Sequence, residues 1–350
     1  MTSHLQKSRA VIFGCAAHVL TADEVAFFAS EQPWGFILFA RNCDTPSQIK
    51  ALCEQLRQSV GRADAPILID QEGGRVARLR PPLAPTRPPM KSFGDLLALD
   101  PAAAARATRL GARLIAADLH ALGINVNCVP MVDVRQDDAH DIVGDRSFGT
   151  DPEMVTALGA EVIAGCLEGG VLPIIKHIPG HGRALVDSHH DLPRVNAAKE
   201  DLRKIDFLPF KKLANAPIKA PMAMSAHVIY EAYDPDHCAT QSSIIIQDVI
   251  RGEIGFDGLL MTDDLSMKAL GGSFEGRSEK ALKAGCDMLL HCNGDMTQMV
   301  DVARAAPILS GDARRRADAA LAMLKPVAGF DQQAEEKNFA KLMKPVMGRA

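Results

Sequence analysis

The densest group of residues able to do chemistry lies between residues 176 and 191, where four histidines and two aspartates occur. Histidine titrates near neutral pH, so it can transfer protons or bind a metal ion. Asp187 and His189 are two positions apart. A carboxylate beside an imidazole favours the charged form of the ring. The pair therefore predicts a proton shuttle that works near pH 7.

The same histidines could instead bind a metal ion. Barrel metallohydrolases usually supply H-x-H from one strand, and zincins supply H-E-x-x-H from one helix. Neither motif occurs in this sequence. A glycine-rich segment also holds metal ligands less rigidly than a strand or a helix does. We expect no metal and no other cofactor, and the residues by themselves leave the metal alternative open.

Eight short apolar runs, separated by helical patterns, indicate the elements that must position these residues. The runs cover residues 10–15, 36–39, 66–70, 124–130, 171–177, 220–227, 258–264 and 287–292. Near-continuous apolar runs are typical of parallel strands buried on both faces. Strands that alternate with helices eight times predict an α/β fold, a (β/α)8 barrel of the TIM type. The alternative, a doubly wound dinucleotide-binding sheet, lacks G-x-G-x-x-G after its first strand.

Helix start signals support this alternation. Residues 21–24 form a capping box, in which Thr21 and Glu24 each bind a free backbone amide of the first turn. Thr45 precedes a proline at a first helical position. Residues 101–122 are rich in alanine and leucine and end before a glycine, which predicts a long helix.

Two connections are longer than usual. Residues 80–90 are rich in proline and predict a rigid surface loop. Residues 178–195 form a long segment of glycine, histidine and aspartate, and loops of this length are usually functional. We expect one barrel domain over residues 1–325 and a C-terminal tail or helix over residues 326–350.

Polar residues follow six of the eight predicted strands. They are Asp70, Asp133, Lys176, His177, His227, Asp263, Asp264, His291 and Asn293. Each of them alone could simply cap the next helix. In barrel enzymes, however, the active site lies at the carboxyl ends of the strands. Burying a charged side chain there is unfavourable in free energy unless it is paired with an opposite charge or takes part in binding or catalysis. Together these residues predict an active site at this end of the barrel.

Four motifs resemble those of glycoside hydrolase family 3, and most closely its single-domain bacterial β-N-acetylhexosaminidases. They are I-D-Q-E-G-G-R-V-A-R at residues 69–78, G-D-R-S-F at 144–148, K-H-I-P-G-H-G with D-S-H at 176–189, and M-T-D-D-L-S-M at 261–267. The resemblance extends over about residues 10–325. Four separate motifs in the expected order are much more specific than one.

The resemblance implies roles for eight residues. Asp263 would attack the anomeric carbon and form a covalent glycosyl-enzyme. His189 would protonate the leaving oxygen and later deprotonate water, with Asp187 as its dyad partner. The residues implied to bind a terminal N-acetylglucosamine are Asp70, Arg78, Arg146, Lys176 and His177. A histidine donor departs from the usual carboxyl donor of retaining glycosidases, and an imidazole can serve near pH 7.

By this resemblance the protein would be a retaining exo-β-N-acetylglucosaminidase. Its substrate would be GlcNAc-1,6-anhydro-N-acetylmuramic acid, with or without peptide, in peptidoglycan recycling. Aromatic residues make up only 5% of the chain, which favours a pocket for one sugar over a polymer groove. Three alternatives stay open: substrate-assisted catalysis by the Asp263–Asp264 pair, phosphorolysis, and sugar binding without catalysis.

Composition excludes several other classes of protein. The 39 basic and 43 acidic residues leave a net charge of −4, so we expect no nucleic-acid or membrane partner. The apolar run at residues 10–15 is too short for a signal peptide, and it predicts a buried first strand. Eight scattered cysteines without C-x-x-C indicate reduced thiols in the cytoplasm. The sequence does not indicate the oligomeric state.

Overall fold

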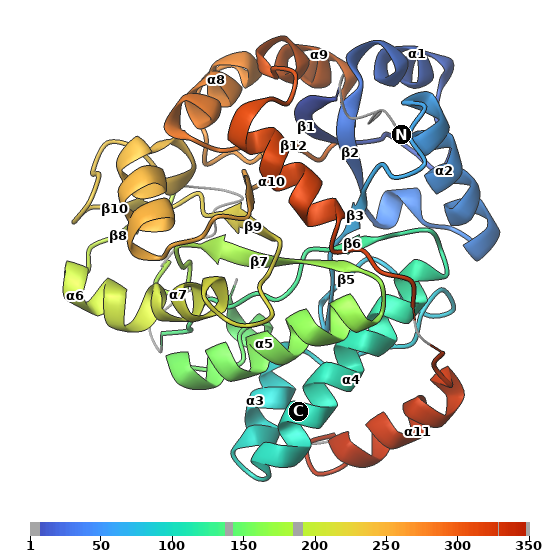
Figure 1. The fold of residues 1–350 in the computed structure, drawn as a ribbon, viewed down its shortest axis with the longest axis vertical. Helices are drawn as coiled ribbons and strands as arrows, with labels where there is room; N and C mark the ends of the chain where they lie inside the picture. Colours follow the sequence, from blue (N-terminus) through green and yellow to red (C-terminus); the bar gives the residue numbers. More distant parts are fainter. Residues whose placement is uncertain (1–7, 137–142, 185–191, 328, 348–350) are drawn as a thin grey trace.

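The computed structural model describes residues 8–136, 143–184, 192–327 and 329–347, and these form a barrel surrounded by helices (Figure 1). The strands of the barrel are β1 (Arg9–Gly14), β2 (Pro33–Leu38), β3 (Ile67–Ile69), β6 (Val126–Asn127), β7 (Leu172–Ile178), β9 (Met222–Ser225), β11 (Leu259–Met261) and β12 (Leu289–His291). Their order in the sheet is β11-β9-β7-β6-β3-β2-β1-β12, and all paired neighbours are parallel. A bridge between Met261 and Met288 joins the two edges. The predicted (β/α)8 barrel is confirmed.

Each of the eight predicted apolar runs contributes one of these strands. Successive residues of a strand point to opposite faces of the sheet. Ile12 and Leu68 therefore belong to one buried cluster, inside the barrel. Their neighbours Val11 and Ile67 belong to a second cluster, between the strands and the helices. Burial on both faces explains why the runs are continuously apolar.

Three helices, α1 (Ala22–Glu31), α2 (Pro46–Ser59) and α4 (Pro101–His120), begin at the predicted start signals. The others are α3 (Met90–Leu97), α5 (Pro152–Glu168), α6 (Lys199–Asp201), η4 (Leu202–Asp206), α7 (Leu208–Ala214), η6 (Ile244–Glu253), α8 (Phe274–Ala284), α9 (Met296–Ala305), α10 (Gly311–Leu321) and α11 (Gln332–Met343), with short helical turns η2 (Ala40–Asn42), η3 (Gly144–Arg146) and η5 (Ala239–Gln241). Thr21 and Glu24 form the predicted capping box, and Thr45 caps α2.

Two short strand pairs were not predicted. β4 (Gln71–Gly73) and β5 (Val76–Ala77) form an antiparallel hairpin directly after β3, and β8 (Arg194–Val195) pairs with β10 (Ile229–Tyr230). Strands of two or three residues are too short to produce a recognisable alternation of apolar and polar residues.

The prediction of a surface loop over residues 80–90 is wrong in part. Ala84 and Arg87 are buried, and Met90 already begins α3. The arginine is buried because its charge is paired with two carboxylates, which a local pattern of prolines cannot reveal.

The C-terminal segment contains α11, which lies alongside α4 (Figure 1). Phe339 and Met343 of α11 are buried there.

All eight cysteines are free thiols, and seven of them are buried. Within the described part of the chain, no helix is both long enough and apolar enough to cross a bilayer.

Candidate active site

A cavity of about 270 Å³ opens beyond the carboxyl ends of the strands. Six of the eight site residues predicted from the sequence line it: Asp70, Arg78, Arg146, Lys176, His177 and Asp263. The other two, Asp187 and His189, lie outside the described residues. Pockets for drug-sized ligands are about 300–1,000 Å³, so this cavity is of a size for a small ligand such as one sugar ring.

Asp70 occupies the position directly after β3 and binds two cations. It accepts a hydrogen bond from Arg78 Nη2 at 3.0 Å and another from Lys176 Nζ at 3.0 Å. Burial alone would raise the pKa of Asp70, but Lys176 and Arg78 hold it well below its usual range. Asp70 is therefore an ionised acceptor in the wall of the cavity.

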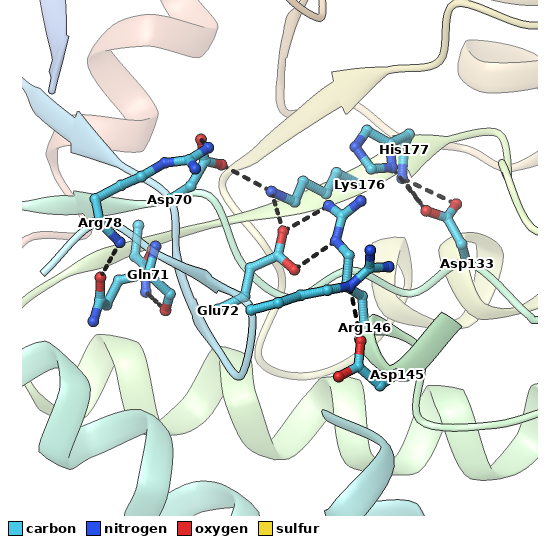
Figure 2. Close-up of polar contacts among 11 residues, drawn as sticks. Asp70, Gln71, Glu72, Arg78, Asp133, Asp145, Arg146, Lys176 and His177 are labelled. Carbon is cyan, nitrogen blue, oxygen red and sulfur yellow. Dashed lines mark hydrogen bonds and ion pairs between the residues drawn. The ribbon is translucent and has the colours of Figure 1, made fainter. Parts of the chain in front are cut away.

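Glu72 of β4 is a site residue that the sequence analysis missed. Its carboxylate accepts two hydrogen bonds from Arg146, at 2.7 and 2.8 Å, and lies 2.7 Å from Lys176 Nζ. Figure 2 shows Lys176 between Asp70 and Glu72. Against the effect of burial, Arg146 and Lys176 lower the pKa of Glu72 to about 2. The signal was present, since Glu72 stands inside the quoted motif at residues 69–78.

Gln71 fixes the hairpin that carries these groups. Its side-chain oxygen accepts hydrogen bonds from the backbone amides of Arg78, at 2.9 Å, and Leu79, at 3.0 Å. Its side-chain nitrogen donates to the carbonyl oxygen of Leu79 at 2.8 Å. Since Gln71 is 3% exposed, these bonds are protected from water, and they hold the backbone of Arg78 next to Asp70.

Replacing Lys176 with Met is expected to destabilise the fold, because Asp70 and Glu72 would each lose a buried partner. Breaking a buried ion pair costs about 3 kcal/mol or more. In the wild type, the low pKa of Glu72 contributes stability above pH 4.5, and this is lost as the pH falls toward 2. Urea unfolding measured between pH 2 and pH 7 checks this prediction. The variant should have a lower free energy of unfolding at pH 7, and that free energy should depend less steeply on pH than in the wild type.

The control for this prediction is Lys212→Met, which removes an exposed lysine paired with Glu153. Exposed ion pairs contribute about 0–1 kcal/mol, so this variant should unfold like the wild type. Equal stability of the two variants at pH 7 would show that the buried cluster does not depend on Lys176.

Asp133 orients His177 at the end of β7. His177 Nδ1 lies 2.7 Å from one carboxylate oxygen of Asp133, and the backbone amide of His181 donates to the other oxygen at 2.7 Å (Figure 2 shows the His177 contact). Asp133 is fully buried, which would raise its pKa, but His177 and His181 lower it. An ionised Asp133 favours the proton on Nδ1 of His177. The sequence predicts the position of Asp133 after a strand but not its partner.

Asp263 and Asp264 have different environments although they are neighbours. Asp264 accepts hydrogen bonds from the amides of Ser266 and Cys292 at 2.9 and 3.1 Å, and from the Ser266 hydroxyl at 2.6 Å. Both of its oxygens therefore stabilise the turn after β11. Asp263 accepts the amide hydrogen of Asp264 at 2.8 Å, and both aspartates line the cavity.

Two strand-end histidines belong to the structural core. His227 is fully buried between Thr240 Oγ1, at 2.8 Å from Nδ1, and the carbonyl oxygen of Asp264, at 3.1 Å from Nε2. His291 lies 3.1 Å from Gln298 Oε1 and is also buried. Neither lines the cavity. Their polar character reflects hydrogen bonds that hold the loops after β9 and β12.

The metal alternative concerns a segment that lies partly outside the described residues, because Asp187, His189, His190 and Asp191 are not among them. Among the residues that the structure describes, no group of three or more His, Cys, Asp or Glu side chains is arranged to hold a metal ion. Asp70, Glu72 and Asp133 are instead paired with lysine, arginine or histidine.

Comparisons with known proteins show the family of this chain. The family model described as glycosyl hydrolase family 3 N terminal domain matches residues 18–320. A β-hexosaminidase of Alkalilimnicola ehrlichii is 37% identical over 288 residues, which cover 81% of this chain and 80% of that protein.

Two solved structures have the same fold over nearly the whole chain. NagZ from Neisseria gonorrhoeae, in complex with N-trifluoroacetyl-D-glucosamine, is 28% identical with a TM-score of 0.84, and 98% of each chain is covered. A family 3 β-N-acetylglucosaminidase from Paenibacillus sp. str. FPU-7 is 28% identical with a TM-score of 0.83, over 99% of this chain and 68% of that one.

A parallel barrel with a small charged pocket at the carboxyl ends of its strands is the architecture of a barrel enzyme. The chain belongs to glycosyl hydrolase family 3. Within this family it is a glycoside hydrolase of the β-N-acetylhexosaminidase type.

Proposed function

We propose that the enzyme is a retaining exo-β-N-acetylglucosaminidase that removes terminal β-1,4-linked GlcNAc from peptidoglycan fragments. Its substrate would be GlcNAc-1,6-anhydro-N-acetylmuramic acid, with or without peptide, in cytoplasmic cell-wall recycling. The observation that carries the proposal is that Asp263 and five predicted sugar-binding residues line one cavity of about 270 Å³. A pocket of this size favours one terminal sugar over a long polymer.

The charges of the pocket suit a neutral sugar. Lys176 is paired with Asp70 and Glu72, and the two carboxylates also bind Arg78 and Arg146, respectively. The charges therefore largely cancel while donors and acceptors remain fixed in direction. Hydroxyl groups both donate and accept hydrogen bonds, so such an array can orient them. Loss of a substrate hydroxyl would leave buried polar groups unpaired, which makes recognition specific.

Hydrolysis would proceed in two steps. In the first, the Asp263 carboxylate attacks C1 of the sugar while His189 donates a proton to the leaving oxygen. In the second, His189 removes a proton from water, which attacks C1 and breaks the bond to Asp263. Two inversions at C1 retain the β configuration. Asp187 would stabilise the charged form of the His189 ring.

The names of the relatives support the choice of sugar. The relative from A. ehrlichii is a β-hexosaminidase, and the N. gonorrhoeae structure holds an N-acylated glucosamine. In this chain, the five residues predicted to bind N-acetylglucosamine are among those that line the pocket, which supports the proposal.

Hydrolysis of p-nitrophenyl β-GlcNAc beside the matching β-glucoside tests the proposal. We expect cleavage of the GlcNAc substrate to be faster by at least about tenfold in kcat/KM, because the glucoside lacks the amide that the site would recognise. Proton NMR during the reaction should show β-GlcNAc as the first product. An α product first, or equal rates on both sugars, would contradict the proposal, and release of sugar-1-phosphate in phosphate buffer would show phosphorolysis.

A further inference from the structure

A partly buried ion network connects α11 with the loop before α3. The Arg87 guanidinium, 4% exposed, donates to both carboxylate oxygens of Glu336, at 2.7 and 2.6 Å, and to Asp118 at 3.1 Å. Gln332 donates to the other oxygen of Asp118 at 2.6 Å. Bidentate pairs between arginine and a carboxylate fix both distance and orientation. Glu336 therefore determines where Arg87 can lie.

The backbone at Arg87 supports the turn of the β4–β5 hairpin. The amide of Gly74 donates to the carbonyl oxygen of Arg87 at 2.8 Å. A Cβ atom on Gly73 would lie 2.4 Å from the carbonyl oxygen of Pro88, and one on Gly74 would lie 2.7 Å from Cβ of Pro89. Both glycines have positive φ, at 98° and 55°. The turn thus packs directly on residues 87–89, at a distance that only glycine allows.

The hairpin seated there carries groups of the sugar pocket. Glu72 immediately precedes the turn and binds Lys176 and Arg146. On its other side, Glu72 lines a small cavity together with Arg87 and Phe339 of α11. The Arg87 guanidinium also lies 5.8 Å from the centre of the Phe339 ring. Glu72, whose carboxylate binds Lys176, and Phe339 of α11 therefore line the same small cavity.

We infer that Arg87 and Glu336 are positioning residues of the sugar site, and that α11 is part of its support. This helix lies beyond residues 18–320, which the family model matches. The inference rests on the proposed function, since it takes Lys176 and Arg146 to bind the sugar. Loss of the bidentate pair would let the hairpin shift and would misdirect Glu72, weakening sugar binding in the ground state and the transition state alike.

The test compares Glu336→Gln with the control Glu335→Gln, an isosteric change at the neighbouring residue of α11. Glu335 is half-buried, and its side chain accepts a solvent-exposed hydrogen bond from Asn338 at 3.1 Å. With p-nitrophenyl β-GlcNAc, Glu336→Gln should raise KM by about fivefold and leave kcat within about twofold, as expected for lost uniform binding. The Kd of GlcNAc should rise in parallel. Hydrogen exchange over residues 71–78 should become faster in Glu336→Gln only.

Assays are made well below the Tm of each variant, so that unfolding does not contribute. Glu336→Asp, which keeps the charge, should restore part of the lost affinity and replaces Glu336→Gln if that variant does not fold. Equal KM, Kd and exchange rates in the Glu335 and Glu336 variants, even with a lower Tm, would reduce the network to a structural role and overturn the inference. An inactive wild type would refute the proposed function instead, and the exchange rates would still decide the link between α11 and the hairpin.

Discussion

Asp263→Asn is expected to lower kcat on p-nitrophenyl β-GlcNAc by about 10³-fold or more, because an amide cannot serve as the nucleophile. The side chain accepts one backbone hydrogen bond at the edge of the pocket, and Asn can keep that bond. The variant should therefore fold and still bind GlcNAc. Circular dichroism and the Kd of GlcNAc check both points.

A covalent adduct provides the direct measurement. Incubation of the wild type with a fluorinated GlcNAc derivative that slows the second step should attach one sugar to the peptide that contains residue 263. Asp295→Asn is the matched control, since Asp295 caps α9 and Asn caps a helix equally well; it should be labelled and active like the wild type. Turnover without any adduct would instead favour attack by the acetamido group of the substrate. Such a result would remove Asp263 as the nucleophile.

The environment of Asp264 already bears on that alternative. Substrate-assisted catalysis would need a carboxylate beside Asp263 to orient the acetamido group. Both oxygens of Asp264 accept hydrogen bonds from Ser266, and one also accepts from Cys292. These bonds give Asp264 a structural role in the turn after β11, which favours Asp263 acting directly on the sugar.

His189→Ala is expected to lower kcat/KM on GlcNAc-1,6-anhydro-N-acetylmuramic acid by about 10²–10⁴-fold, the usual contribution of general acid catalysis. The loss should be much smaller with p-nitrophenyl β-GlcNAc, because p-nitrophenolate leaves without a proton. Rates over a series of aryl leaving groups should depend more steeply on leaving-group pKa in the variant. His189 lies outside the described residues, so this prediction comes from the sequence motif.

Two further variants make this prediction specific. Asp187→Asn should show the same dependence on the leaving group with a smaller loss, because it removes only the support of the imidazole charge. His237→Ala replaces an exposed histidine near Asp234 and should leave both substrates unaffected. Equal losses on the disaccharide and the aryl glycoside in His189→Ala would remove His189 as the general acid.

Local sequence patterns predicted the barrel because strand burial and helix capping each depend on residues that are close together in the chain. A strand buried on both faces must be apolar throughout, as in residues 10–15 and 66–70, whatever its neighbours are. The capping box at Thr21 and the cap at Thr45 satisfy backbone amides within four residues. The hairpin at residues 71–77 was missed because its strands are too short for a pattern. Its glycines are explained only by contact with Pro88 and Pro89.

The sequence by itself determined the eight strands of the barrel, their order along the chain, the family resemblance, and the residue types that could attack, protonate and bind a sugar. Only the tertiary structure decided which charges meet. Glu72, Asp133 and Arg87 have the partners Lys176, His177 and Glu336, respectively, which lie 44 or more positions away. Such pairs form because a buried charge is stable only beside its counter-charge, and the packing of neighbouring strands and of α11 on α4, rather than any local spacing, brings those counter-charges together.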